Sequence, residues 1–581
     1  MEQLDCLIIG ANNRDQKLFS AKQLNRNDCY DTITLNDFKM DPLTALSYVR
    51  SLNGSNINND DSLYSFSEVT SLGPLYLANY LIQRRIVTKF INSFDCEIDS
   101  VIEILQYENP QIVVITTTFY VDPSPLIEIT ELIKKTNPEC KIIIGGPLIF
   151  NLCSKFEENR LYKILNLLGG DIYIYERQGE NTLYELIISL KKQVSLKSVS
   201  NLFIKKSNSF VFTSRRVENN KINDNQINWS VFNKKDLSCV AYTRTSRGCP
   251  YKCSFCNYCY FSPKHELLSL ENIKKDLTGL KNLGINKLIF IDDTLNIPKK
   301  KFEAICNMMI KNNLTFEWYS YIRCGRLKSE NTIKIMIESG CKGVCLGIES
   351  GSNEILKIMN KKETIEDYYK GIELLNKYDI QSLASVIIGF PGETIRTINQ
   401  TIDFLNQAAP SFYRAHLWSY THNSQIHKEA HKYNLQGELF RWWHNTMNWE
   451  DATEEIHRIC TRVHNSIWLP SQNFSIWSFP YLAGIGMTTN QRTKFTSLFS
   501  ELTSYNYSSG INNNFGLKDK ELKLKEFISF CKSLKLKKAK YKLSSLFNSP
   551  LDKSDVKEAV LDKKWQLLKL FLDKNIVTLK T

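Results

Sequence analysis

The chain has 581 residues, of which 43% are hydrophobic and 23% charged, and its formal net charge is +13. This composition is typical of a globular protein of several domains. It offers no apolar run long enough to cross a bilayer and no basic N-terminal region of a secretory signal. We therefore expect a cytoplasmic protein without a membrane partner, whose 16 cysteines are thiols or metal ligands.

Residues 1–205 alternate short β-rich runs with helical stretches. This alternation predicts a doubly wound α/β domain, in which a parallel sheet is covered on both faces. Ligands of such sheets bind at the carboxyl ends of the strands, where small and polar residues let them approach the backbone. The candidate binding residues at these ends are Gly10, Asn12, Thr116, Thr117, Gly145, Gly146, Gly179 and Glu180.

Residues 206–240 are polar and show little periodicity, which is typical of a linker. The alternation of strands and helices resumes in residues 241–425. Six strand–helix units there predict a partial (βα)6 barrel, whose functional residues lie at the C-terminal ends of the strands. The expected strands are 242–246, 287–291, 316–321, 343–348, 382–388 and 412–418.

Residues 426–581 are expected to form a mostly helical C-terminal domain that closes the substrate side of the barrel. Its tract Trp442–Trp449 holds three tryptophans and one histidine, and Trp443 and His444 are the candidate substrate contacts. The alternative is that these side chains form the core of that domain. The lysine-rich segment 518–542 is interpreted as a solvated helix face, so a nucleic-acid partner is not expected.

The first barrel strand is followed by Cys249, Cys253 and Cys256, with the spacing Cys-x3-Cys-x2-Cys. Three thiolates on one loop can bind three irons of a [4Fe–4S] cluster and leave the fourth iron open for chemistry. A zinc site is the alternative, and it would need a fourth ligand such as Cys259.

This motif resembles that of the radical SAM superfamily, and the resemblance covers residues 240–415. It implies an enzyme whose open iron binds S-adenosylmethionine, and an electron donor such as flavodoxin or ferredoxin. Phe255, just before the third cysteine, would lie against the adenine. Asp292 or Asp293 would bind the amino group in place of the family's usual Gly-Gly-Glu, and Arg323 would pair with the carboxylate.

Two further motifs of that family follow on later strands. Glu349 and Ser350 resemble the fourth-strand motif near the ribose and the carboxylate of the cofactor. Gly389 and Gly392 resemble the fifth-strand motif that packs on the adenine.

A doubly wound domain before such a barrel resembles the cobalamin-dependent subclass, whose members are methyltransferase-like. No dinucleotide fingerprint follows the first strand. The first histidine of the chain is His265, so the N-terminal domain cannot supply a histidine ligand to cobalt. The 442–449 tract resembles the subgroup of P-methyltransferases and natural-product maturases.

The resemblance implies methylation of an unactivated carbon, or of phosphinate phosphorus, in a peptide or small-molecule intermediate. Three alternatives remain open. Cobalamin could serve a radical rearrangement or ring closure without methyl transfer. A tRNA methylthiotransferase would need a second cluster motif, for which the upstream cysteines are too scattered. The last alternative is a non-catalytic relative with a relict cluster.

Overall fold

The computed structural model describes residues 3–11, 31–35, 38–52, 62–118, 120, 122–207, 209–234, 237–262, 264–470, 474–506, 514–542 and 556–572. The chain divides into two compact units. The first unit comprises Met1–Leu24, Thr70–Val231 and Lys542–Thr581, and the second comprises Asn25–Val69 and Phe232–Tyr541. No helix within the described residues is long and apolar enough to cross a membrane.

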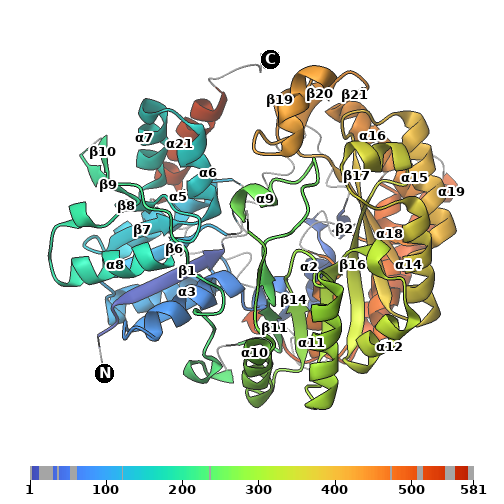
Figure 1. Cartoon of the computed structure of the whole chain (residues 1–581), viewed down its shortest axis with the longest axis horizontal. Helices are drawn as coiled ribbons and strands as arrows, with labels where there is room; N and C mark the ends of the chain where they lie inside the picture. Colours follow the sequence, from blue (N-terminus) through green and yellow to red (C-terminus); the bar gives the residue numbers. More distant parts are fainter. Residues whose placement is uncertain are drawn as a thin grey trace. The chain divides into compact units, whose positions relative to one another are not determined.

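The sheet of the first unit confirms the doubly wound fold (Figure 1). Its parallel strands run in the order β5 (Thr88–Ser93), β1 (Cys6–Ala11), β6 (Ile112–Thr116), β7 (Lys141–Gly145) and β8 (Ile172–Ile174). The order reverses between β1 and β6, where the chain moves from one half of the sheet to the other. Two antiparallel strands, β9 (Leu202–Lys206) and β10 (Ser209–Phe212), extend the sheet beyond β8.

Successive residues of these strands enter two different apolar cores. In β1, Cys6 and Ile8 pack with α3 (Leu72–Ile82) and α8 (Glu180–Lys191). Leu7 and Ile9 point the other way, into a core built with four helices of the N-terminal segment. Those helices are α4 (Ile98–Glu103), α5 (Ser124–Thr136), α6 (Pro147–Lys155) and α7 (Glu158–Leu168). Both faces of the sheet are therefore buried, which leaves the strand ends for binding.

The end of the chain completes the second of these cores. Helix α21 (Val556–Leu572) packs on α5 and α7, and its Val560 and Leu567 are buried there. Lys564 Nζ lies 2.7 Å from Glu128 Oε1, and Lys563 pairs with Glu131. This differs from the expected boundaries, because residues 542–581 belong to the first unit and not to a C-terminal domain.

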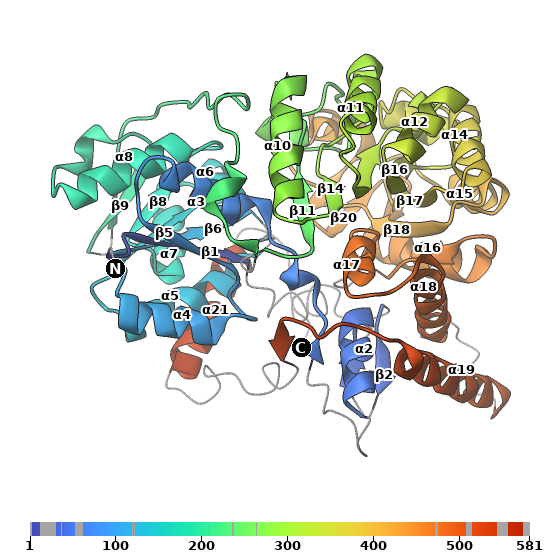
Figure 2. The ribbon, with the colours of Figure 1, turned by 90° about the horizontal axis from the view of Figure 1, so that it is seen from below.

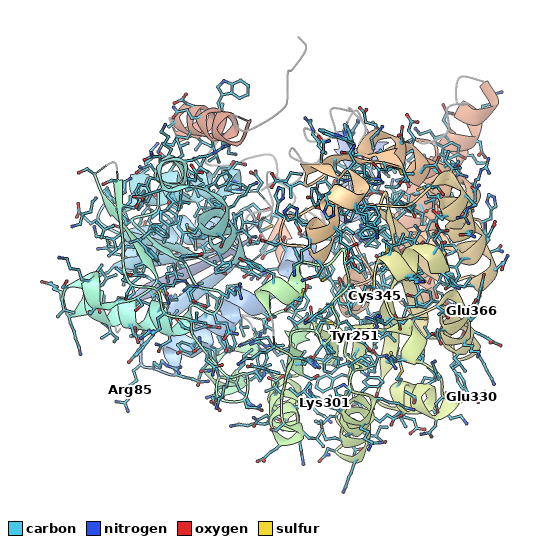
Figure 3. All side chains as sticks on the ribbon, turned by 45° about the horizontal axis from the view of Figure 1, so that its top comes forward. Arg85, Tyr251, Lys301, Glu330, Cys345 and Glu366 are labelled. Carbon is cyan, nitrogen blue, oxygen red and sulfur yellow. The ribbon has the colours of Figure 1, made fainter. Side chains whose placement is uncertain are left out.

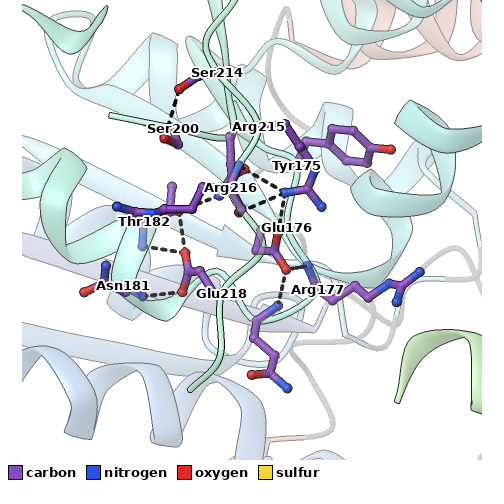
Figure 4. Close-up of polar contacts among 12 residues, drawn as sticks. Tyr175, Glu176, Arg177, Asn181, Thr182, Ser200, Ser214, Arg215, Arg216 and Glu218 are labelled. Atoms are coloured by element: carbon purple, nitrogen blue, oxygen red, sulfur yellow. Dashed lines mark hydrogen bonds and ion pairs between the residues drawn. The ribbon is translucent and has the colours of Figure 1, made fainter. Parts of the chain in front are cut away.

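The expected linker 206–240 is also built into the first unit as far as Val231. Figure 4 shows how its polar residues hold the loop after β8. Arg215 pairs with the buried Glu176, and the carboxylate of Glu218 accepts from the backbone N–H groups of Asn181 and Thr182 at 3.0 and 2.8 Å. Glu218 thereby caps helix α8, whose own N-cap residue is a glycine.

The second unit contains the expected barrel, and all six predicted strands are present within three residues of their expected ends. They pair in parallel in chain order, as a sheet that ends on the short strand β22 (Ile467–Trp468). The six strands are β11 (Val240–Thr243), β14 (Lys287–Phe290), β15 (Glu317–Ile322), β16 (Cys341–Glu349), β17 (Gln381–Ile388) and β18 (Phe412–Leu417). The connecting helices are α10 (Leu270–Asn282), α11 (Lys299–Lys311), α12 (Glu330–Glu338), α13 (Asn353–Ile358), α14 (Ile365–Lys377) and α15 (Ile395–Ala408).

Residues 426–470 complete this barrel. The hairpin strands β19 (Gln436–Glu438), β20 (Arg441–His444) and β21 (Met447–Asn448) lead into α16 (Trp449–Arg462), which packs against β18 and β17 before β22 joins the sheet. The barrel therefore does not end at 425, because one more strand–helix–strand unit is needed to reach β22.

Later helices fill the other end of the barrel. Helix α17 (Ser478–Gly484) packs against β11, β14 and β15, and Gly484 lies against Cys239 at the start of β11. The apolar core around α17 also includes α18 (Thr489–Ser504), α19 (Asn514–Ser533) and α2 (Pro42–Ser51). Helix α2 comes from residues 25–69, the early segment of the chain that belongs to the second unit. Figure 2 shows α2 beside α19, two elements far apart in sequence. Around Gly484 this region lies at the N-terminal strand ends, and Trp477, just before α17, contacts Tyr321 of β15.

We expect α21 to contribute strongly to the stability of the first unit. Leu567 is 2% exposed and Leu561, on the same helix, is 58% exposed. Leu567→Ala should lower the free energy of unfolding by roughly 2–5 kcal/mol, because it leaves a cavity against α5 and α7. The control Leu561→Ala should change it little. Urea denaturation measures both, and equal effects would contradict the packing described here.

Candidate functional site

The three cysteines lie on a loop that begins at a constrained glycine. Gly248 has φ +82°, and a Cβ atom there would collide with the carbonyl oxygen of Lys264. Cys253 is buried, whereas Cys249 and Cys256 are half-buried. Burial, together with the neighbouring thiols of Cys253, Cys259 and Cys249, raises the pKa of Cys256 to about 12.

The thiols of Cys249, Cys253 and Cys259 are thus near enough to Cys256 to affect its ionisation. Thiols in this state become thiolates only when a bound cation offsets their charge, which fits an iron–sulfur cluster. Within the described parts of the chain, no three Cys, His, Asp or Glu side chains converge as they would on a single metal ion. A cubane places its thiolates on three different irons, so this finding does not bear on the cluster.

A buried arginine reaches the central cysteine. Arg323 Nη1 lies 4.0 Å from Cys253 Sγ, and the guanidinium sits 3.7 Å from the ring centroid of Tyr251, labelled in Figure 3. Its Nη2 pairs with Glu363 Oε2 at 3.0 Å and donates to the carbonyl of Lys361. Arg323 was expected to pair with a cofactor carboxylate, but in the structure it already has a carboxylate partner from the protein.

A second buried ion pair lies beside the first. Lys361 Nζ is 2.9 Å from Glu349 Oε1 and 5.9 Å from the ring centroid of Phe255. Burial alone would lower the pKa of Lys361, but Glu349 raises it, so the pair is held as ions. Glu349 has φ +64° at a bulge in β16, and its side chain there reaches Lys361.

Sequence reasoning missed Lys361 and Glu363. Both lie between α13 and α14, in a charged stretch that reads as an exposed loop. Only their burial shows that they belong to the site.

The two aspartates after β14 have different roles. Asp292 is 1% exposed and accepts from the backbone N–H and the hydroxyl of Thr245, both at 2.9 Å, and from the hydroxyl of Ser246. It therefore fixes the chain just before the cysteine loop. Asp293 is half-buried, and its pKa is raised to about 7 by burial and by Asp292. Of the two, Asp293 has the free capacity to accept from an ammonium group.

The turn after β17 is shaped by close packing. Gly389 has φ +89°, and a Cβ atom would enter the ring of Trp442. Its N–H donates to Glu393 Oε2 at 2.6 Å. Gly392 has φ +93°, and Ser350 is fully buried with its hydroxyl accepting from the N–H of Ser352. These residues occupy their expected positions at the C-terminal strand ends.

The structure does not support a substrate contact for His444. Its ring is stacked on Trp442, with centroids 5.2 Å apart, and is 8% exposed. Nε2 donates to the carbonyl oxygen of Gly389 at 3.0 Å, so Nδ1 accepts from the Thr446 hydroxyl at 3.1 Å. Both ring nitrogens are used within the protein, and the core alternative for this residue holds. Trp443 points to the other side of β20 and is 36% exposed.

The candidate residues of the first unit gather at the carboxyl ends of its strands. Gly10 lies one residue before the end of β1 and packs against the Asn92 carbonyl, while its own carbonyl accepts from Tyr120 at 3.0 Å. Thr116 ends β6, where its hydroxyl lies 3.1 Å from that of Thr118. Gly10 and Thr116 therefore flank the point at which the strand order reverses. Asn12 lies outside the described residues.

The other candidates there are largely engaged within the unit. The Thr117 hydroxyl donates to the Gly145 carbonyl at 2.9 Å, and Gly146, with φ +111°, packs on Thr117. Gly179 packs on Ile174, and Glu180 accepts from Asn220 at 2.7 Å.

The sequence of residues 243–405 matches the radical SAM superfamily. This chain carries a radical SAM domain. Its (βα)6 architecture and the three cysteines after the first strand agree with that match. A curated relative is an uncharacterized methyltransferase, PH0819, of Pyrococcus horikoshii, which is 25% identical over 68% of this chain and 87% of its own length. Methylthiotransferases are also among the curated relatives.

Solved structures share the fold beyond the radical SAM domain. TsrM from Kitasatospora setae, a radical S-adenosylmethionine methyltransferase solved with tryptophan and a SAM analogue, has a TM-score of 0.53 and 12% identity. That match covers 90% of this chain and 99% of TsrM. OxsB, a cobalamin-dependent radical enzyme solved with aqua-cobalamin, has a TM-score of 0.53 and 14% identity over 99% of this chain and 82% of its own.

Glu393 makes the stability of the radical SAM domain depend on pH. Burial raises its pKa to about 8, above the ordinary 4.5 that it regains on unfolding. Between these values the folded state holds a proton that the unfolded state has lost, so the free energy of unfolding should fall as pH rises toward 8. Glu393→Gln should remove that fall, as measured by urea denaturation at pH 5, 7 and 9. The exposed control Glu338→Gln should keep it, and an unchanged slope in Glu393→Gln would contradict the assignment.

Proposed function

We propose that this chain is a cobalamin-dependent radical SAM methyltransferase that acts on an unactivated carbon, or on phosphinate phosphorus, of a peptide or natural-product intermediate. The observation that carries the proposal is the joining of a doubly wound domain, without a dinucleotide fingerprint, to a radical SAM domain in one chain. The methyltransferase name of one relative and the bound cobalamin of OxsB support it.

Cys249, Cys253 and Cys256 would hold the cluster, which when bound supplies the electron that cleaves S-adenosylmethionine. Arg323 donates toward Cys253 Sγ and so stabilises the thiolate form of that ligand. Its pairing with Glu363 keeps the guanidinium in place and offsets its charge.

The other residues of the site orient the cofactor. Asp293 would accept from the ammonium group of S-adenosylmethionine. Phe255 would pack on the adenine, and Gly389, which leaves room for the ring of Trp442, shapes the turn after β17. Lys361 and Glu349 form an ion pair, so the ammonium and the carboxylate would face the polar groups of the cofactor side by side.

Cobalamin would bind at the switch point between β1 and β6 of the first unit. Gly10 and Thr116 lie at the carboxyl ends of these two strands. Residues at the same edge of the sheet are Thr117, Gly145, Gly146, Gly179 and Glu180. Because no histidine precedes His265, we propose that the first unit leaves the lower face of cobalt without an imidazole ligand.

Two alternatives predict different observations. A cobalamin-dependent rearrangement or ring closure would form no S-adenosylhomocysteine, whereas methyl transfer must form it. A methylthiotransferase would need a second cluster. Among the described cysteines before the barrel, Cys6 and Cys140 are buried in the apolar cores of the first unit at 0% and 1% exposure, which disfavours that reading.

Alanine variants of Cys249, Cys253 and Cys256 test the cluster. Each should lose iron and abolish 5′-deoxyadenosine formation, because a missing thiolate frees one iron. Cys259→Ala is the matched control on the same loop and should retain both. Normal 5′-deoxyadenosine formation by Cys253→Ala would contradict the assignment.

The reconstituted protein should retain about one equivalent of hydroxocobalamin, as expected for one site at the switch point. The electron paramagnetic resonance spectrum of the cob(II)alamin form should show no superhyperfine splitting from a protein nitrogen. Such splitting would refute the absence of a histidine ligand. Failure to retain any corrinoid would refute the assignment of the first unit.

A further inference from the structure

The chain that follows β18 contains a short segment that is anchored at both ends. At one end, the backbone of Tyr420 exchanges two hydrogen bonds with that of Leu439, at 2.8 and 2.7 Å, in the hairpin of β19 and β20 labelled in Figure 1. At the other end, the N–H of Ile426 donates to the carbonyl of Ser254 in the cysteine loop at 2.9 Å. Residues 420–427 therefore follow a fixed path beside that loop.

Two histidines of this segment approach each other. The Nδ1 atoms of His422 and His427 are 3.4 Å apart, and their rings are nearly perpendicular, with centroids separated by 4.7 Å. Both residues are exposed. The hydroxyl oxygen of Tyr420 lies 2.6 Å from His427 Nδ1. Three atoms that carry lone pairs thus lie within hydrogen-bonding distance of one another or of a common neighbour.

Hydrogen bonding alone does not account for this approach. Partial burial and the neighbouring His422 lower the pKa of His427, so its ring is neutral at pH 7 and its Nδ1 can accept the Tyr420 proton. An imidazole nitrogen has one lone pair, and the bond from Tyr420 uses it. The Nδ1 of His422 therefore approaches a nitrogen that has no second lone pair to offer.

The spacing of the two nitrogens fits a tetrahedral metal ion. Zinc binds histidine nitrogens at about 2.0–2.1 Å, and tetrahedral angles then place two such nitrogens roughly 3.3–3.4 Å apart. The separation between His422 Nδ1 and His427 Nδ1 has this value. A negative charge is also near, because burial and then the carboxylate of Glu438 raise the pKa of Tyr420. The surroundings therefore favour a cation.

A different histidine pair is suggested by sequence spacing but not by the structure. His427 and His431 are four residues apart, which is a metal-binding spacing on an α-helix. They lie instead on the 3-10 helix Gln425–Tyr433, whose three residues per turn place them on different faces. His422 is therefore the better partner for His427.

We propose that His422 and His427 bind one divalent transition-metal ion, with zinc as its representative, through their Nδ1 atoms. The ion would replace the Tyr420 proton at His427, and water would fill the remaining positions. Because His427 directly follows Ile426, the ion would also hold this segment on the cysteine loop. The site shares no ligand with the cluster and lies outside the proposed function, so neither proposal depends on the other.

Isothermal titration calorimetry with zinc chloride tests the site. The protein is first reconstituted with its cluster, so that the three cysteine ligands are occupied. It should bind about one equivalent of zinc at this site. His422→Ala and His427→Ala should each weaken that binding at least about tenfold, because each leaves a single imidazole. Circular dichroism of every variant shows that the fold is intact.

Two other exposed histidines provide matched controls. His431→Ala and His464→Ala should bind zinc as tightly as the wild type does. Absence of saturable binding in the wild type, an unchanged affinity in His422→Ala, or a loss confined to His431→Ala would overturn the proposal.

Hydrogen exchange tests the effect of the ion on the segment. Zinc should slow exchange of the backbone N–H groups of Ile426 and His427 in the wild type, because it opposes local opening of the contact with Ser254. It should have no such effect in His422→Ala. Equal exchange in the wild type with and without zinc would refute the claim that the ion holds this segment in place.

Discussion

A parallel sheet buried on both faces leaves only its strand ends for chemistry, and both sheets of this protein obey that constraint. In the first unit, neighbouring residues of β1 enter opposite apolar cores. In the second, helices cover the outside of the barrel, while α17 and α2 fill its N-terminal end. The cysteine loop, the aspartates after β14 and the glycines after β17 all lie at the remaining end, because no other part of the sheet is free.

Charge compensation then decides what each polar residue at that end can do. The thiolates of a bound cluster would attract the buried cations Arg323 and Lys361. In the structure a carboxylate holds each cation in place: Glu363 pairs with Arg323, and Glu349 pairs with Lys361. Asp292 is likewise engaged within the protein, because its hydrogen bonds with Thr245 and Ser246 leave it little capacity for a ligand. Residues of one motif thus divide between holding the loop and facing the cofactor.

The sequence predicted the six barrel strands and the cysteine loop, because strand–helix alternation and a fixed cysteine spacing are local signals. Lys361 and Glu363 could not be predicted in the same way. Their importance comes from burial in ion pairs with Glu349 and Arg323, and that burial depends on contacts distant in sequence. For His444 the neighbouring tryptophans Trp442 and Trp443 suggested a pocket, whereas in the structure its ring is stacked on the buried Trp442. The domain boundaries differed because α21 and residues 25–69 pack with partners several hundred residues away.

The path of the chain between its two units has a consequence for biosynthesis. Residues 25–69 leave the first unit for the second, and residues 542–581 return to the first after the barrel is complete. On the ribosome, the first sheet is made early, but the face that α21 covers must wait for the final forty residues. Until then Glu128 and Glu131 on α5 lack their lysine partners and the adjoining apolar core is open. The first unit therefore begins synthesis first and is completed last. Because each unit is encoded by separated segments, neither can be exchanged as one uninterrupted stretch of gene.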